Sequence, residues 1–124
     1  MVGTTPMLEV RGLSHPDDML RFHKGRIEMV RIGGAAVARA TFEPGWKWSE
    51  CEKQLAGTEL CEMPHTGYVV SGRLAVQMAD GTEVELRPGD AVFIPPGHDG
   101  WVMGDEPVVM LDFGVPDASA EPTR

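Results

Sequence analysis

The sequence predicts an all-β fold, an antiparallel sandwich or small barrel, in a single domain spanning residues 1–124. Three observations predict it. Apolar and polar residues alternate with a period of two along most of the chain, turn residues recur roughly every eight to twelve positions, and helical periodicity is nearly absent. About eight to ten short strands follow from this spacing. A chain of this length can bury one core of its own.

The two ends of the chain differ from its centre. Residues 1–25 form an N-terminal extension ahead of the first clear strand pair, and the polar segment 115–124 is typical of a flexible tail. The extension holds the one helical signal, because Pro16 and the two aspartates after it could open one or two helical turns before Gly25 ends them. We therefore expect a short N-terminal helical turn.

The first strand pair is predicted from alternation and glycine. Residues 26–32 alternate between two faces, and Gly33 and Gly34 then permit a tight turn into residues 35–43, so we predict a β-hairpin. If the segment WKWSE, residues 46–50, is extended, Trp46, Trp48 and Glu50 lie on one side of it.

The second half of the chain carries the strongest local signal. The runs LAVQM and TEVEL flank the turn Ala79-Asp80-Gly81, which predicts a second hairpin. Further apolar runs, each preceded by turn residues, predict three more strands: AVFIPP, WVM and VVMLDF.

Composition excludes some classes of function. Nineteen acidic and eleven basic residues give a net charge of -8, and such a chain repels a phosphate backbone, so we expect no nucleic-acid partner. No apolar run approaches the roughly 20 residues that cross a bilayer, so we expect no membrane partner. The first residues lack a basic start followed by an apolar core, and on that absence we expect a cytoplasmic location.

The two cysteines, Cys51 and Cys61, are too few for a disulfide framework. In a reducing compartment such a pair is more often free thiol or metal ligand than a bridge, although a single Cys51–Cys61 disulfide stays open as an alternative.

Cys61 and His65 lie four residues apart in a segment that otherwise predicts a buried strand. Even spacing would put Glu59, Cys61 and His65 on one side of that strand. Four residues of straight strand span about 13 Å, too far for a thiolate and an imidazole that bind one metal at about 2.3 and 2.1 Å. Pro64 could supply the bend, since proline occurs at strand starts and bulges. The alternative is that both are ordinary core residues.

The segment GDAVFIPPGHDGWVMG, residues 89–104, resembles the second of two short signatures of the cupin superfamily. That signature reads G, five residues, P, one residue, G, two residues, H, three residues, N. Gly89, Pro95 and Gly97 stand at the expected spacing. Glycines occupy the expected histidine and asparagine positions, and His98 lies two places earlier than the histidine of the family.

The first signature of the family holds most of its metal ligands. It reads G, five residues, HxH, three or four residues, E, six residues, G. Counting back from Gly72 places His65 at the glutamate position, and Cys61 and Glu59 at the two histidine positions. All three are still residue types that bind metals. The resemblance covers about residues 45–113 and implies a double-stranded β-helix, the jelly-roll barrel of cupins.

The resemblance implies a small metal-binding cupin that acts on or binds a small organic molecule in the barrel mouth. The implied ligands are Cys61, His65 and His98, with Glu59 either as a fourth ligand or as the catalytic base. A thiolate with imidazoles favours zinc first and ferrous iron second, and argues against magnesium or calcium. Three protein ligands would leave a position open for water or substrate. His98 could instead be a surface turn residue.

Several functional questions stay open at this level. Oxygenase, isomerase, lyase and hydrolase chemistry are not distinguished, and the alternative is a non-catalytic small-molecule or metal-binding regulatory module. Trp46, Trp48 and Trp101 could line the substrate pocket, or they could belong to the core or to an oligomer contact. Cupins often pair through their outer sheets, so the resemblance implies a homodimer, with the N-terminal strands as natural contacts.

Overall fold

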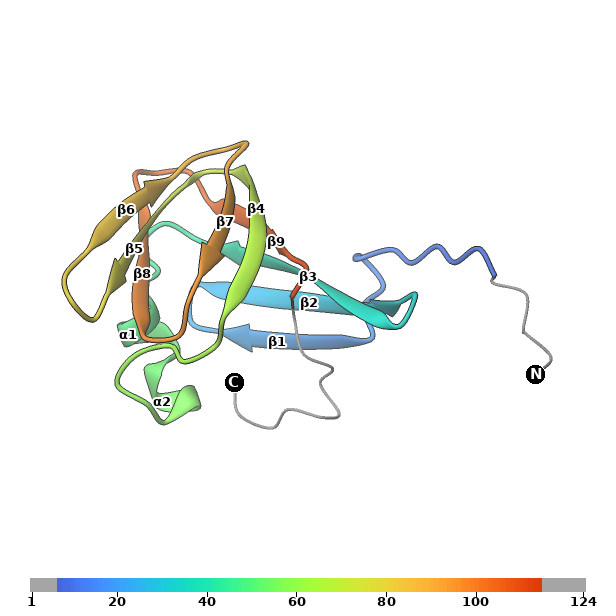
Figure 1. The fold of residues 1–124 in the computed structure, drawn as a ribbon, viewed down its shortest axis with the longest axis horizontal. Helices are drawn as coiled ribbons and strands as arrows, with labels where there is room; N and C mark the ends of the chain where they lie inside the picture. The colour runs from blue at the N-terminus through green and yellow to red at the C-terminus, as the bar shows by residue number, and fades with distance from the viewer. Residues whose placement is uncertain (1–6, 115–124) are drawn as a thin grey trace.

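Two antiparallel sheets hold nearly all the regular structure of the computed structural model, which describes residues 7–114 (Figure 1). The larger sheet has the strand order β1-β2-β3-β9-β4-β7 and the smaller has the order β6-β5-β8. The strands are β1 (Asp18–Phe22), β2 (Gly25–Ile32), β3 (Ala35–Phe42), β4 (His65–Ser71), β5 (Arg73–Met78), β6 (Glu83–Leu86), β7 (Ala91–Ile94), β8 (His98–Met103) and β9 (Val108–Asp112). The tail predicted over residues 115–124 lies outside the described residues.

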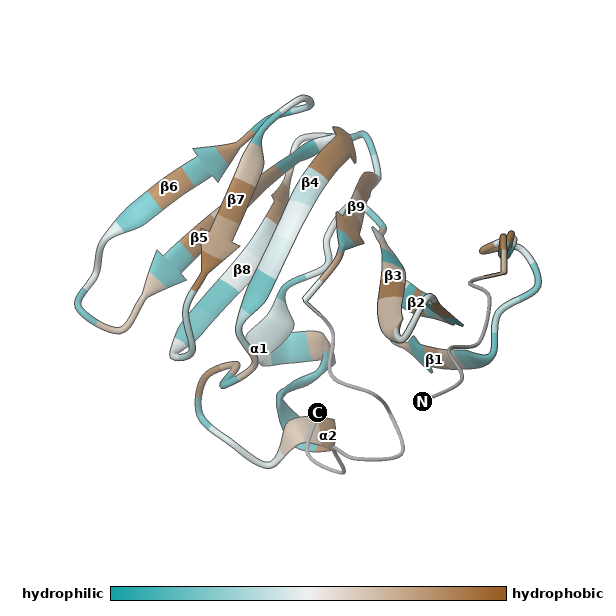
Figure 2. Ribbon diagram, turned by 45° about the vertical axis from the view of Figure 1, so that its right-hand side comes forward, coloured by the Kyte–Doolittle hydropathy of each residue, from teal (hydrophilic) through white to brown (hydrophobic). Residues whose placement is uncertain are grey.

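Both predicted hairpins are confirmed. In the first, Ile32 of β2 lies opposite Ala35 of β3 across Gly33 and Gly34, whose φ angles are 58° and 79°. Such positive values favour glycine, because other residues meet steric strain there. In the second, β5 and β6 pair around the turn that contains Gly81. Hydrophobic and hydrophilic residues alternate along β6, as Figure 2 shows.

The expected N-terminal helical turn is replaced by a strand. Residues Asp18–Phe22 form β1, which pairs antiparallel with β2 from Asp18–Met29 to Phe22–Gly25. An isolated helix of one or two turns is unstable in water, whereas β2 offers a full row of backbone partners. Tertiary pairing therefore overrides the local helical signal.

Two short helices, which the sequence did not predict, follow β3. Trp48–Cys51 forms α1 and Lys53–Ala56 forms α2. The carboxylate of Asp99 accepts a hydrogen bond from the backbone N–H of Ser49 at 3.1 Å, which holds the first turn against β8. This turn lets two nearby tryptophans enter the same core, where Trp46 stacks on Phe42 with ring centroids 3.9 Å apart.

The core lies between the two sheets. Val69 of β4 and Val108 of β9 are fully buried, and the aromatic residues around Phe42 belong to the same cluster. Strand pairing does not join the sheets into one continuous ladder within residues 7–114. Among these residues there is also no helix with the length and apolar character needed to cross a membrane.

Candidate metal centre

Cys61, His65 and His98 come together at one end of the space between the sheets. His65 is the first residue of β4 in the large sheet, and His98 is the first residue of β8 in the small sheet. Cys61 lies before β4 and is joined to His98 by a backbone bridge, in which the Cys61 N–H donates to the His98 carbonyl at 2.8 Å. The Gly97 N–H donates to the Cys61 carbonyl at 2.8 Å, so the chain is held on both sides of the thiol.

The chain bends between Cys61 and His65. Residues 62–64 belong to no strand, and β4 begins directly after Pro64. The bend brings the Cys61 Sγ to 3.7 Å from the His65 Nε2. A straight strand would have separated these residues by about 13 Å.

Each imidazole is oriented by an oxygen atom on its Nδ1 side. The Nδ1 of His65 lies 2.6 Å from the Oδ2 of Asp112, and the Nδ1 of His98 lies 2.8 Å from the carbonyl oxygen of Pro95. A carbonyl oxygen only accepts hydrogen bonds, so the His98 Nδ1 donates, and an ionised Asp112 is an acceptor in the same way. Both rings therefore have Nε2 available for a metal, as metal-binding histidines usually do.

The close contacts change the acidity of two of the three groups. Burial acts to raise the pKa of the Cys61 thiol, but hydrogen bonds with His65 and His98 outweigh it and lower the pKa from 9.0 to about 6. Burial acts to lower the pKa of His65, but the Asp112 carboxylate and Cys61 outweigh it and raise the pKa to about 9. Near neutral pH the metal-free pair is therefore a thiolate beside an imidazolium.

The three residues could together hold one metal ion. The Sγ atom and the two imidazole nitrogens all lie within 4.8 Å of one another. In a tetrahedral zinc site, bonds of about 2.3 Å to sulfur and about 2.0 Å to nitrogen put these two ligand atoms about 3.6 Å apart. The Cys61–His65 separation of 3.7 Å matches that spacing. The cluster could therefore hold a metal ion without rearrangement of this pair.

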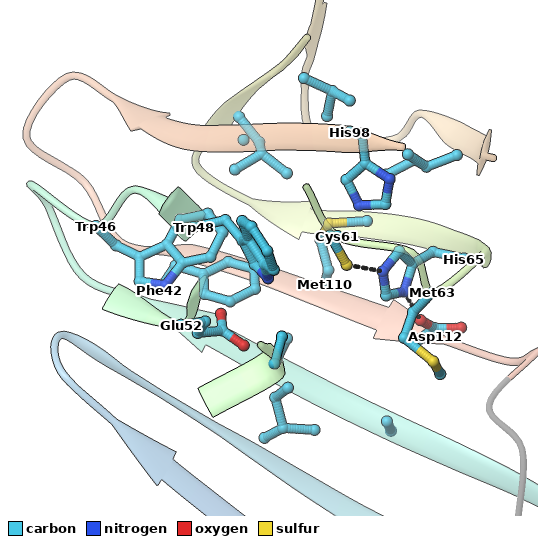
Figure 3. A pocket seen from close by; sticks show the side chains of 18 of the residues that line it. Phe42, Trp46, Trp48, Glu52, Cys61, Met63, His65, His98, Met110 and Asp112 are labelled. Carbon is cyan, nitrogen blue, oxygen red and sulfur yellow. Dashed lines mark hydrogen bonds and ion pairs between the residues drawn. The ribbon is translucent and has the colours of Figure 1, made fainter. Parts of the chain in front are cut away.

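A cavity of about 340 Å³ adjoins the cluster, and Figure 3 shows its lining. Cys61, His65 and His98 lie at one end, while Phe42, Trp46 and Trp48 are grouped at the other. The walls come from both sheets and from the two short helices.

Glu59 does not join the cluster. Its side chain is 90% exposed and pairs with the Nζ of Lys53 at 2.9 Å. The prediction from even spacing fails here, because residues 57–60 form no strand and their side chains therefore do not alternate between two faces. We therefore assign Glu59 no role as ligand or catalytic base.

The three predicted pocket tryptophans separate into two groups. Trp46 and Trp48 line the cavity, but Trp101 does not. His98 and Gly100 alternate along β8 and both line the cavity, whereas Trp101 points to the other face of the strand, where the Lys47 Nζ lies 5.2 Å from its ring centroid. Parity within the strand was the signal that could have excluded Trp101.

Sequence reasoning missed two carboxylates, Asp112 and Glu52, that line the cavity. Asp112 lies 47 residues from His65, and only the pairing of β9 with β4 brings them together. The sequence did contain a signal for Asp112, because Val108, Met110 and Asp112 alternate along one strand. The first two are buried, so Asp112 lies on the same face of β9 as two core residues. Glu52 joins α1 to α2, which sequence reasoning did not expect to be helical.

Comparisons with known proteins agree with this fold. The cupin domain model matches residues 61–114, which include all three cluster residues. A cupin-like protein from Thermotoga maritima is similar with a TM-score of 0.53 and 20% identity, covering 89% of this chain and 81% of that one. KdgF from Halomonas sp. has a TM-score of 0.50 and 20% identity, covering 77% and 85%.

A larger protein shares the same fold. An oxalate decarboxylase from Lactobacillus farciminis has a TM-score of 0.56 and 19% identity, covering 81% of this chain but only 31% of the other. A comparison with curated proteins gave no match. The cupin domain match over residues 61–114, together with these structural neighbours, shows that this chain has a cupin-like fold.

Proposed function

We propose that this protein binds one divalent metal ion through Cys61, His65 and His98 and that it binds or converts a small organic molecule in the adjoining cavity. The observation that carries the proposal is the convergence of the three donor atoms within 4.8 Å. Both imidazoles have their Nδ1 atoms engaged by oxygen, which supports metal binding through Nε2.

Zinc is the metal we propose first and ferrous iron second. One thiolate and two imidazoles are ligands that zinc prefers, whereas magnesium and calcium prefer oxygen. All three residues line the cavity, so a further coordination position would open toward it. A metal bound there supplies a Lewis acid for a coordinated oxygen atom. Three protein ligands with an open position favour chemistry over a purely structural site, and binding without turnover is the alternative.

Elemental analysis tests the site. Protein purified without added metal, then exchanged into equimolar zinc, should retain about one zinc per chain, and Cys61→Ala and His65→Ala should each lose it. Cys51→Ala and His23→Ala are matched controls outside the cluster and should retain it. A wild-type protein that cannot hold zinc would contradict the proposal, and so would a His65→Ala variant that holds it as well as wild type.

The likeness to an oxalate decarboxylase is a likeness of fold, and we do not extend oxalate to this chain. A bound dicarboxylate would have the proposed metal as its one cationic partner. Among residues 7–114, neither lysine nor arginine lines the cavity.

A second candidate function is acyl transfer by Cys61 as a nucleophile. Asp112, His65 and Cys61 form a hydrogen-bonded chain, with 2.6 Å between Asp112 and His65 and 3.7 Å between His65 and Cys61. A thiol activated by a histidine that a carboxylate orients is a common arrangement for covalent catalysis. Hydrolysis of p-nitrophenyl acetate that persists in EDTA and disappears in Cys61→Ala would favour this function, whereas a rate equal in the two proteins would remove it.

We also propose a homodimer in the cytoplasm. β1 lies at the edge of the large sheet, and Met19 on it is exposed, which suits pairing with a second copy. Cys51 and Cys61 are both free thiols, as expected in a reducing compartment. Sedimentation velocity tests the assembly, and a monomer at all accessible concentrations would contradict it.

A further inference from the structure

The cavity has two chemically different ends, and together they describe a ligand. Metal-binding side chains occupy one end and three aromatic side chains the other, with Met110 between them (Figure 3). Resting on the metal site proposed above, we infer that the ligand is a small aromatic molecule that gives oxygen donors to the metal and carries no second anionic group.

The size of the cavity supports a ligand of this kind. Its volume of about 340 Å³ falls in the range of small-molecule sites. The space exists because β3 presents small side chains, Ala38 and Ala40, toward the cavity, and Ala56 of α2 does the same. Larger residues at these positions would fill it.

The far end presents flat apolar surface. Phe42 and Trp46 are stacked, with an angle of 21° between their ring planes, and Trp48 lies beside them. An aromatic ring gains from burial against such a wall and from ring-to-ring contact beyond simple burial.

The charges of the lining argue against a second anionic group. Outside the metal cluster, the ionisable residues that line the cavity are Glu52 and Asp112, both acidic. Within the described chain, no lysine or arginine joins them. A carboxylate or phosphate brought to the aromatic end would lose its hydration and gain no cationic partner, which is a large cost in free energy.

Acetohydroxamate, benzohydroxamate and 4-carboxybenzohydroxamate test the inference. They share one metal-binding group, so differences in their affinity report on the rest of the cavity. Their dissociation constants are measured by calorimetry on zinc-loaded protein, with metal-free protein as the blank. Benzohydroxamate should bind at least about tenfold more tightly than acetohydroxamate, because the ring buries more apolar surface than the methyl group. 4-Carboxybenzohydroxamate should bind at least about tenfold more weakly than benzohydroxamate, because its carboxylate would be buried without a partner.

A pair of alanine variants on the same strand locates the effect. Ala40→Phe fills the cavity and should remove the preference for benzohydroxamate over acetohydroxamate. Ala35→Phe makes the same change at an exposed position of β3 and should keep the preference. Zinc content is measured in every sample.

The outcomes separate the two proposals. Equal affinity for benzohydroxamate and acetohydroxamate in protein that holds one zinc would overturn the inference and leave the metal site standing. Tighter binding of the 4-carboxy compound would overturn it as well. A wild-type protein that holds no zinc would overturn the proposed function, and the inference with it. If Ala40→Phe does not fold, the three probes on the wild type still decide.

Discussion

Asp112 sets the direction in which His65 presents its Nε2 atom. One carboxylate oxygen contacts the His65 Nδ1 at 2.6 Å, and the other accepts a hydrogen bond from the Gly114 N–H at 3.2 Å. The carboxylate is thus fixed by its neighbours and cannot rotate freely away from the ring. Such a partner both orients a metal-binding imidazole and makes it a stronger donor.

The Asp112→Asn substitution tests this positioning role. It removes the negative charge while keeping the shape, so zinc affinity should fall by about 10- to 100-fold. Competition with a chromophoric chelator measures the dissociation constant, and circular dichroism checks the fold. Asp105→Asn, at an exposed position, is the matched control and should bind zinc like wild type. Equal zinc affinity in Asp112→Asn and wild type would show that Asp112 does not support the site.

The pH dependence of zinc affinity follows from the two shifted pKa values. The pKa of His65 is raised to about 9 and that of Cys61 is lowered to about 6. Between these values zinc must displace one proton, from His65, so affinity should rise about tenfold per pH unit. Below pH 6 it must also displace the Cys61 proton, so the slope should approach about a hundredfold per unit.

Zinc titrations between pH 5.5 and 9.5 check this slope, with the competing chelator calibrated at each pH. Asp112→Asn removes one cause that raises the His65 pKa, so its affinity should level off at a lower pH than in wild type. Affinity that does not change between pH 6 and 9 would contradict the charged state assigned to His65.

At the scale of elements, the sequence correctly predicted the hairpins, which depend on residues that are neighbours along the chain. The hairpin turn at Gly33 and Gly34 and the hairpin formed by β5 and β6 depend on neighbouring residues, and both were confirmed. β1 was missed because its strand state depends on pairing with β2. In the site, Cys61 and His65 were predicted from their positions in a motif and His98 from a place two residues before the histidine of the motif, whereas Asp112 depends on the distant pairing of β9 with β4.

Gly72 joins β4 to β5 at a position that admits only glycine. Its φ angle is 79°, and a Cβ atom there would lie 2.4 Å from the carbonyl oxygen of Pro107 and 2.7 Å from the Cα of Val108. Gly72→Ala should therefore lower the free energy of unfolding by roughly 1–2 kcal/mol through backbone strain and by a further 1–3 kcal/mol, approximately, through overpacking.

Urea denaturation measures this loss, and Gly81→Ala separates its two causes. Gly81 has a φ angle of 91°, but a Cβ there would meet no atom within 4 Å. That variant should show only the backbone strain, about 1–2 kcal/mol. Equal destabilisation in the two variants would mean that the contact with Pro107 and Val108 relaxes without cost.

At the scale of the whole molecule, the proposed metal would connect the two sheets. His65 belongs to β4 of the large sheet and His98 to β8 of the small sheet, and strand pairing does not join these sheets within residues 7–114. The cavity that separates them removes packing contacts which would otherwise hold them together. A metal bound by both strands would replace some of that lost cohesion.

Zinc should therefore raise the thermal stability of the protein. A ligand that binds only the folded state adds about 2.7 kcal/mol at a hundred times its dissociation constant, which corresponds to a rise in Tm of roughly 10 °C for a chain of this size. Scanning calorimetry with zinc and with EDTA measures the difference. His98→Ala removes the ligand from the small sheet and should abolish most of the rise, whereas His15→Ala, at an exposed position, should keep it. If zinc stabilises both variants equally, His98 is not the group through which the metal holds the small sheet to the large one.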